Sequence, residues 1–285
     1  MAAALTAPEI EAAFLAVCAA ELDALKPGNV HRFAPGHGMD VTHFERAARA
    51  AAPFIANAQL SVGQRILRAT EASFAATGLN TNLGIILLTA PLAKAAAETG
   101  VGMGLRRRLA VILSLLDVTD AADAFAAIRL ANPAGLGRAD AGDVHASVDM
   151  TLIQAMNLAA DRDRIANAYV TAFEDIFDFA LPRWVEAHAL ASRPDLAVTT
   201  LHMALLAEYP DSHICRKYGV EAAANVRDMA MALKPFWEPV AGVKSEAALV
   251  AFDTDLKARG LNPGTTADFV VATLFADLIS RRKQP

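Results

Sequence analysis

Apolar residues recur along most of the chain at spacings of three and four positions, which is the period of an amphipathic helix, and no convincing run alternates as a strand does. The pattern predicts helices over residues 106–116, 121–130, 148–159 and 162–179. Another helix should span about 82–97 and be bent or offset at Pro91. Further interruptions are expected at Pro182, Pro194, Pro210, Pro235 and Gly260. The sequence therefore predicts an all-α fold.

Pairs of polar residues three positions apart mark where several helices should begin. Three such pairs resemble capping boxes: Thr6 with Glu9, Thr42 with Glu45, and Ser61 with Gln64. The first helix should reach about Leu25, and Gly78 should end the third. Because neither a low-complexity linker nor a repeat divides the chain, we expect a single multi-helix domain across residues 1–285 with a central buried helix layer.

Composition narrows the class of protein. The chain has 285 residues, a hydrophobic fraction of 54%, a mean hydropathy of +0.31 and a formal net charge of −5. No apolar run is long enough to cross a bilayer, and the start has neither the basic leader nor the apolar stretch of a signal peptide. The two cysteines are isolated, and the basic clusters are short. We expect a cytoplasmic protein with no disulfide, no membrane span and no nucleic-acid partner.

Two loops, remote from each other in the chain, combine hydrogen-bond donors with Gly or Asn and lead into helices: LKPGNVHRFAPGHGMD (residues 25–40) and TGLNTNLGIILLTAPL (residues 77–92). Helix N-termini offer unpaired backbone N–H groups and a partial positive charge, which suit phosphates. Lys26 could meet a phosphate as a point charge, whereas Arg32 could bind two oxygens at once. The loops therefore predict a nucleotide-polyphosphate site between helices.

Simpler explanations exist for the same residues. Gly28 could cap an ordinary helix-terminating turn, and one of Asn80, Thr81 and Asn82 must cap the following helix. Capping accounts for one of those three polar residues and not for all of them. Asp40 lies one turn before His43, so a transition-metal site in the first loop is a further alternative.

Two later loops have a similar composition: EYPDSHICRKYG (residues 208–219) and the start of LNPGTTADFVVATLFADLI (residues 261–279). Asp211 could hold Mg²⁺ or position a hydroxyl, although a helix N-cap would explain it equally well. Asp268, placed in the first turn of the last helix, could simply complement the helix dipole. The Gly-rich segment 131–145 could form a mobile lid.

In this order, the four segments resemble the motifs of the triphosphoribosyl-dephospho-coenzyme A synthase family along most of the chain. KPGNVHR resembles the Lys-Pro-Gly motif, and Met39, Asp40 and Phe44 follow it as in the family. GLNTNLG resembles Gly-Val-Asn-Thr-His-Lys-Gly, YPDSHICRKYG resembles Asp-Thr-Asn with a basic residue downstream, and NPGTTADFVVATLF resembles Ser-Pro-Gly-Gly-Ser-Ala-Asp-Leu. No single motif is specific, whereas four in the same order are.

The resemblance implies an all-helical transferase that moves the triphosphoribosyl group of ATP to the 2′-hydroxyl of 3′-dephospho-coenzyme A and releases adenine. It implies ATP as substrate with Mg²⁺ as cofactor, and it leaves a homodimer open. Carried over to this sequence, the catalytic and metal-binding residues are Asp40, Asp211 and Asp268. The nucleotide-binding residues are Lys26, Gly28, Asn29, His31, Asn80, Thr81, Asn82, Arg216, Lys217, Gly264 and Thr265.

The chain departs from the family pattern at two places. Asn82-Leu83 stands where the family has His-Lys, and His213 stands where it has Asn. The segment ADRDRIANAYVTAFEDIF (residues 160–177) and the Thr-Asn-Leu-Gly variant (residues 81–84) resemble an outlying branch found in archaea and methylotrophic bacteria. The alternatives are therefore a related ribosyl or phosphoribosyl transferase with another acceptor in methanopterin-type one-carbon cofactor biosynthesis, an N-glycosidic hydrolase, or a non-catalytic nucleotide-binding protein.

Overall fold

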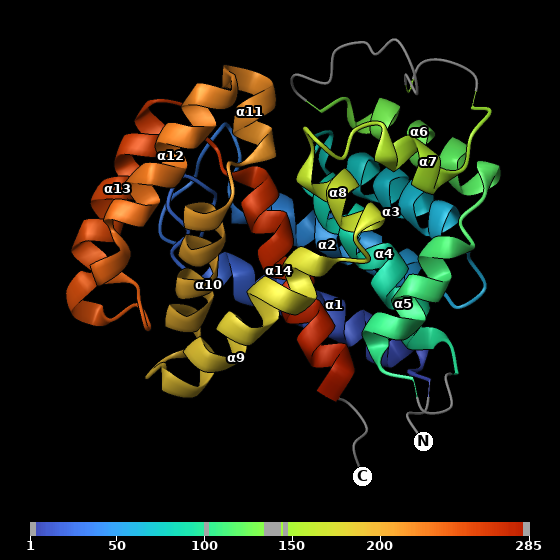
Figure 1. Cartoon of the computed structure of the whole chain (residues 1–285), viewed down its shortest axis with the longest axis horizontal. Coiled ribbons are helices and arrows are strands. Elements are labelled where there is room, and N and C mark those ends of the chain that lie inside the picture. The colour runs from blue at the N-terminus through green and yellow to red at the C-terminus, as the bar shows by residue number, and fades with distance from the viewer. Residues whose placement is uncertain (1–3, 100–102, 134–143, 145–147, 282–285) are drawn as a thin grey trace. The chain divides into compact units, whose positions relative to one another are not determined.

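The computed structural model describes residues 4–99, 103–133, 144 and 148–281. Within these residues the regular elements are helices and none is a strand, so the all-α prediction is confirmed (Figure 1). The α-helices are α1 Ala7–Asp23, α2 Val41–Ala56, α3 Val62–Thr77, α4 Leu83–Ala97, α5 Leu105–Ser114, α6 Val118–Ala131, α7 Leu152–Asn157, α8 Arg164–Val170, α9 Leu181–Leu190, α10 Pro194–Glu208, α11 Ser212–Tyr218, α12 Val220–Ala232, α13 Glu246–Ala258 and α14 Gly264–Arg281. A π-helical segment spans Asp175–Ala180, and 3₁₀ turns span Lys234–Phe236 and Val243–Ser245.

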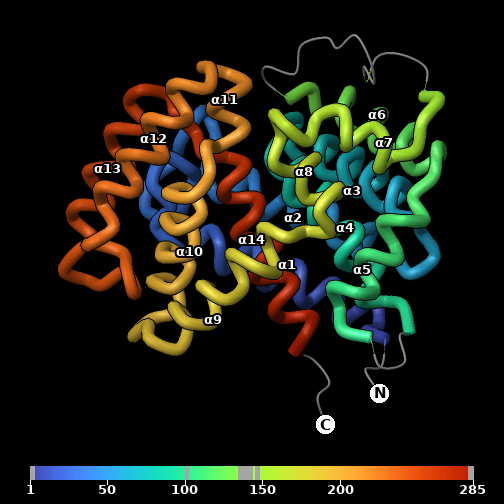
Figure 2. The backbone as a smooth tube through the Cα atoms, viewed as in Figure 1, coloured from blue at the N-terminus to red at the C-terminus, as the bar shows by residue number. Residues whose placement is uncertain are grey.

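The chain divides into two compact units, each assembled from several segments. Unit 1 comprises the described residues of Met1–Val17, Phe44–Glu174 and Phe275–Pro285, and unit 2 comprises Cys18–His43 and Asp175–Leu274. The path of each unit can be followed along the backbone in Figure 2. The expectation of one domain across residues 1–285 stays a prediction, and each unit is described by itself.

In unit 1, α3 packs along α6, and α4 packs against α3 and α5. Helix α4 is buried on nearly every side, which agrees with the expected buried helix layer. Pro91 lies inside α4 and lacks the N–H that would bond to the Leu87 carbonyl four residues earlier. The hydroxyl of Tyr169 donates to that carbonyl over 2.6 Å. The Leu87 carbonyl thus has a donor in place of the missing amide, and α4 runs continuously from Leu83 to Ala97 through Pro91.

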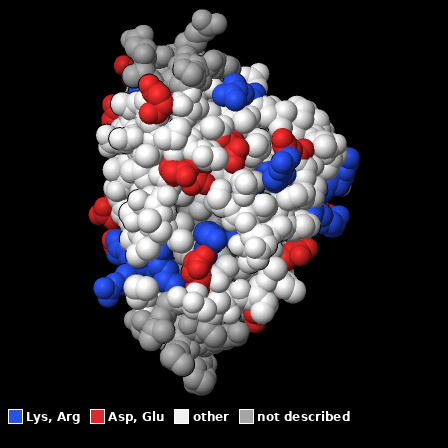
Figure 3. Space-filling model, turned by 90° about the vertical axis from the view of Figure 1, so that its right-hand side faces the viewer, with Lys and Arg blue, Asp and Glu red and all other residues white. Residues whose placement is uncertain are grey.

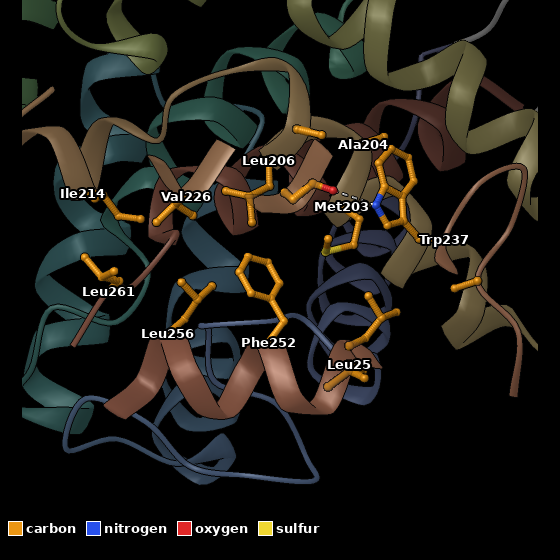
Figure 4. Close-up of a cluster of buried hydrophobic side chains, with 14 of the residues drawn as sticks. Leu25, Met203, Ala204, Leu206, Ile214, Val226, Trp237, Phe252, Leu256 and Leu261 are labelled. Carbon is orange, nitrogen blue, oxygen red and sulfur yellow. Dashed lines mark hydrogen bonds between the residues drawn. The ribbon is translucent and has the colours of Figure 1, made fainter. Parts of the chain in front are cut away.

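In unit 2, the nearly all-buried α10 packs against α9 and α12, and α11 packs against α12. Figure 4 shows the apolar cluster that fills this unit, in which Phe252 and Leu256 of α13 lie close to Leu206 of α10. Trp237 closes one side of the cluster, and its indole N–H donates to the Ala230 carbonyl over 3.0 Å. This core holds α13, whose Asp253 and Lys257 contact the loop of residues 25–40 in the same unit.

Some of the helix boundaries predicted from the sequence are confirmed, and others are wrong. The capping box of Ser61 and the left-handed Gly78 bound α3 as expected. The prediction of one helix across residues 162–179 is wrong, because Ala172 (φ 50°) and Phe173 (φ 62°) take left-handed conformations that end α8. Pro182 is the second residue of α9, which directly follows the π-helical segment, and Ala180 at the end of that segment has a helical backbone (φ −74°, ψ −44°), so the chain does not leave the helical conformation at this proline.

Two further expectations from the sequence concern the start of α2 and the surface. Helix α2 begins at Val41 and is capped by Asp40, so the pairing of Thr42 with Glu45 as its start is wrong. None of the helices in the described ranges combines the length and hydropathy that a bilayer crossing needs. On the face drawn in Figure 3, acidic and basic side chains are interspersed among neutral ones. The expected lid over residues 131–145 lies largely outside the described residues.

Candidate functional site

Three of the four loops lie together in unit 2. The first loop contacts the last one through the Asn29 side chain, whose Nδ2 donates to Asn262 Oδ1 over 2.8 Å. The third loop contacts the last one through Asp211, whose Oδ2 accepts from the Thr266 N–H over 2.7 Å and from its hydroxyl over 2.8 Å. Asn29 and Asn262, which are 233 positions apart, and Asp211 and Thr266, which are 55 positions apart, therefore join the three loops into one cluster.

Gly28 is the point of closest approach between the first and last loops. Its φ is +84°, and a Cβ added there would lie 2.7 Å from Pro263 Cδ and 3.0 Å from the Leu261 carbonyl oxygen. Its N–H donates to Asp253 Oδ1 over 2.9 Å, and His37 Nε2 lies 2.8 Å from its carbonyl oxygen. Both the backbone conformation and the contact require glycine, so Gly28 does more than end a helix.

Lys26 is fully buried, and the protein itself supplies partners for its ammonium group. The Nζ atom lies 2.7 Å from Glu21 Oε1 and donates to Asn29 Oδ1 over 3.1 Å and to the Val30 carbonyl. Burial lowers the pKa of Lys26 and raises that of Glu21, and the attraction between the two charges opposes both shifts. With its three N–H donors occupied, Lys26 orders the loop and makes no direct phosphate contact in this arrangement.

Sequence reasoning missed a charged network on α13 that holds the first loop. Asp253 Oδ2 lies 3.0 Å from Lys257 Nζ and 3.2 Å from His31 Nε2, and Lys257 also donates to the Ala34 carbonyl over 3.2 Å. Burial acts to raise the pKa of Asp253, but the hydrogen bonds from His31, Lys257 and the Gly28 amide outweigh it, so the pKa is lowered. The carboxylate therefore stays ionised and ties the loop to α13.

His31, expected to bind nucleotide, is 2% exposed and belongs to this network. Its Nε2 also lies 3.1 Å from Lys257 Nζ, and burial is the main reason that its pKa is lowered. His202 of α10 is buried nearby in the same unit, with Nε2 lying 3.3 Å from the Pro27 carbonyl oxygen and a pKa lowered by burial to about 3. The loop is thus bounded by two imidazoles that remain neutral at pH 7. An Asp and a Lys four residues apart on one helix were the only sequence signal for the network.

Asp211 closes the N-termini of two helices. Its Oδ1 accepts from the Ile214 N–H of α11 over 3.0 Å, while Oδ2 accepts from the Thr266 N–H in the first turn of α14. The residue is 2% exposed, and burial raises its pKa although these hydrogen bonds oppose the shift. Gly264 and the buried Thr265 begin the same turn, and the Gly264 N–H donates to the Asn262 carbonyl over 2.8 Å. A carboxylate of the protein already occupies the place expected for a phosphate.

Cationic side chains gather at the end of α11. Arg216 and Lys217 lie in its last turn, and Lys217 is exposed with Nζ 5.2 Å from the Tyr218 ring centroid. Burial and the charges of Arg216, Lys217 and His37 lower the pKa of His213 to about 4. Two cations therefore lie in one turn of α11, which keeps Arg216 and Lys217 as candidates for phosphate binding.

The three carboxylates expected to bind metal do not gather. No group of three or more His, Cys, Asp or Glu side chains in the described ranges is placed to hold a metal ion. Asp40 is half-exposed, and its Oδ1 accepts from the Thr42 N–H, the Thr42 hydroxyl and His43 Nδ1, which makes it the cap of α2 and lowers its pKa. Asp268 is half-buried and is the fifth residue of α14, so its expected place in the first turn is wrong. Within the described residues, Asp40, Asp211 and Asp268 therefore form no common metal-binding group, and their assignment to a metal stays a prediction.

The second loop belongs to unit 1. Asn82 occupies the N-cap position of α4, but its side chain makes no capping bond within the described residues. Its Oδ1 instead accepts from the Ser73 hydroxyl over 2.6 Å. Asn80 is half-buried, whereas Thr81 is 9% and Asn82 is 5% exposed. Capping therefore explains none of the three polar residues, where the sequence suggested that it would explain one.

The comparisons with known proteins agree with these motifs. A 2-(5″-triphosphoribosyl)-3′-dephosphocoenzyme-A synthase of Pectobacterium atrosepticum is 30% identical over 103 residues, which are 36% of this chain and only 32% of that relative's length. A crystal structure described as a candidate triphosphoribosyl-dephospho-CoA synthase from Archaeoglobus fulgidus has a TM-score of 0.63 and 22% identity, covering 83% of this chain and 99% of its own, and so shows a similar fold. The sequence model described as ATP:dephospho-CoA triphosphoribosyl transferase matches residues 7–285. The chain belongs to the ATP:dephospho-CoA triphosphoribosyl transferase family.

Proposed function

We propose that this protein transfers the triphosphoribosyl group of ATP to the 2′-hydroxyl of 3′-dephospho-CoA and releases adenine. The family match across residues 7–285 carries the proposal. The contacts among the first, third and last loops in unit 2 support it, because they bring together residues that the family resemblance singles out. Mg²⁺ enters with ATP as the Mg–ATP complex, and we place the reaction in the cytoplasm.

The chemistry is a substitution at C1′ of the ATP ribose. The bond from C1′ to adenine breaks, the acceptor oxygen bonds to C1′, and the hydroxyl proton is lost while adenine gains one. The transition state resembles an oxocarbenium ion, as in glycoside cleavage, so the site must accept the hydroxyl proton and hold the triphosphate. Arg216 and Lys217 provide cations on α11.

Asp40 and Asp268 are the carboxylates that we propose for proton transfer or for contact with Mg–ATP. Asp211 is unsuited to either role because both of its oxygens accept hydrogen bonds from helix N-termini. Asp40 uses Oδ1 for the cap of α2, and none of these bonds reaches Oδ2. Its lowered pKa keeps it ionised at neutral pH.

The experiment is to incubate the protein with Mg–ATP and dephospho-CoA and to measure adenine by chromatography. Asp40→Asn is the informative variant, because asparagine caps helices as well as aspartate but carries no charge. If Asp40 takes part in the reaction, turnover should fall about 100-fold or more with an unchanged melting temperature. Asp268→Asn is tested in the same way. No adenine from the wild-type protein, alongside an active control enzyme, would reject the proposal.

A different acceptor is the second candidate function, and the residues Asn82-Leu83 in place of the family's His-Lys favour it. Adenine release that requires neither dephospho-CoA nor another added acceptor would indicate a hydrolase. Release that depends on a pterin-type one-carbon cofactor precursor would indicate the related transferase. Light scattering of the purified protein tests the homodimer separately.

A further inference from the structure

In unit 1 the N-terminus of α4 differs from the capped starts of α3 and α6, and it shares the lack of a side-chain cap with α5, whose N-cap residue is Gly104. In α3 and α6, the N-cap side chains of Ser61 and Asp117 accept hydrogen bonds from first-turn amides. In α4, which spans 15 residues, Asn82 makes no such bond to any described residue. Since the first amides of a helix have no acceptor inside the helix, the first turn of α4 presents N–H groups that its own cap does not satisfy.

Two buried side-chain atoms at this helix start also have no partner within the described part of the chain. They are Thr81 Oγ1 and Asn82 Nδ2, on residues that are 9% and 5% exposed. The Ser73 hydroxyl holds the other end of the Asn82 side chain, at Oδ1, over 2.6 Å. Buried polar atoms nearly always have a hydrogen-bond partner, so two of them beside an uncapped helix start need an explanation.

The character of these groups identifies the ligand class. The Asn82 NH₂ group and the first-turn amides can only donate, and the Thr81 hydroxyl can donate as well. The helix dipole adds a partial positive charge at the same point. Donors without an acceptor, combined with positive potential, match the oxygens of a phosphate.

We propose that the N-terminus of α4 binds a phosphate group, with Thr81 Oγ1, Asn82 Nδ2 and the first-turn amides as donors. This inference rests on the proposed function, in which ATP brings a triphosphate and dephospho-CoA brings a diphosphate. It narrows the assignment made from the sequence, which placed phosphate contacts at Thr81 and Asn82 and also at Lys26 and the α14 N-terminus. Those two places are already filled by Glu21 and Asp211.

Asn82→Asp separates ligand binding from helix stability. Aspartate is a favourable N-cap and complements the helix dipole, so the variant should melt at the same temperature as the wild type or higher. Its negative charge replaces a donor and should repel a phosphate. By calorimetry at low ionic strength, we expect the affinity for inorganic tripolyphosphate to fall at least tenfold.

Thr151→Asp is the matched control. It makes the same change of charge at the N-cap of α7, where Thr151 already caps the helix by accepting from the Gln154 N–H. We expect its affinity for tripolyphosphate to change less than twofold. Equal losses in both variants would show that net charge alone matters and would overturn the site. Wild-type affinity of Asn82→Asp for both tripolyphosphate and dephospho-CoA would also overturn it.

Thr81→Val provides an independent check, because it keeps the shape of the side chain and removes the buried hydroxyl. If the hydroxyl serves a ligand, the variant should bind tripolyphosphate more weakly without melting at a lower temperature. A lower melting temperature with unchanged affinity would contradict the inference.

Titration with dephospho-CoA identifies which substrate supplies the phosphate. If Asn82→Asp binds tripolyphosphate more weakly than the wild type does, the site is assigned to the triphosphate of ATP. If its affinity falls only for dephospho-CoA, the site is assigned to the diphosphate of the acceptor. Failure of the phosphate site can be distinguished from failure of the proposed reaction. Adenine release by the wild type with unchanged binding and turnover in Asn82→Asp would reject the phosphate site alone, whereas the expected binding losses without adenine release would reject only the reaction.

Discussion

The close approach at Gly28 gives a prediction that can be worked out from the structure. Gly28 and Gly38 lie in the same loop with similar left-handed backbones, at φ +84° and +76°. At Gly28 an added Cβ would lie 2.7 Å from Pro263 Cδ and 2.9 Å from Leu256 Cδ1, whereas no described heavy atom lies within 4 Å of the same position on Gly38. Gly38→Ala is therefore a control for the backbone conformation alone.

The magnitudes follow from these two differences. Placing a non-glycine residue in the left-handed region costs about 1–2 kcal/mol and applies to both variants. Forcing a methyl group into filled space costs about 1–3 kcal/mol more and applies to Gly28→Ala alone. Alanine also restricts the unfolded chain by about 0.4–1 kcal/mol, but this gain is common to both and cancels in the comparison. We expect Gly28→Ala to lower the free energy of unfolding by about 1–3 kcal/mol more than Gly38→Ala does, because the steric cost is the one contribution that does not cancel between the two variants.

Tryptophan fluorescence during denaturant unfolding is the appropriate assay. The chain has two tryptophans, Trp184 and Trp237, and both lie in unit 2 together with the loop. Adenine release should also fall further in Gly28→Ala, because Pro263 would be displaced from the start of α14. Equal losses of stability in the two alanine variants would show that the contact at Gly28 is not filled and would refute the reasoning.

Three further predictions concern buried polar groups. His202 has a folded-state pKa of about 3, far below its unfolded value, so its contribution to stability is present above pH 6.5 and is lost as the pH falls toward 3. Between pH 7 and 4.5, the free energy of unfolding should therefore drop less in His202→Gln than in the wild type. His188→Gln, which replaces an exposed histidine, is the control and should behave as the wild type does. Tyr169→Phe should lower the stability of unit 1 by about 1–3 kcal/mol, measured by circular dichroism, since the buried Leu87 carbonyl loses its donor; unchanged melting would contradict this. Asp253→Asn should lower kcat/KM for adenine release by loosening the first loop, and a variant with full activity would remove the α13 network from the site.

The helices could largely be predicted because their signals are local. The Ser61 capping box and the Gly78 terminator lie within a few residues of the ends of α3, so tertiary contacts were not needed to find them. The break after α8 could not be found in this way, since Ala172 and Phe173 are ordinary residues whose left-handed backbones are imposed by their surroundings. Local propensity fails where the tertiary structure supplies the decisive constraint.

The polar loops could be located from the sequence, but the roles of their residues could not. A loop rich in hydrogen-bond donors indicates a ligand only where the protein leaves those donors unsatisfied. Whether it does so depends on acceptors from distant positions in the sequence, which the loop's own sequence does not reveal. Asp211 shows the difficulty most clearly: two helix starts that the sequence counts as separate anion sites share this one carboxylate. At the start of α4, no carboxylate among the described residues accepts a hydrogen bond from Asn82 Nδ2. The proposed phosphate site therefore rests on unsatisfied buried donors at a helix start, and not on the density of polar residues.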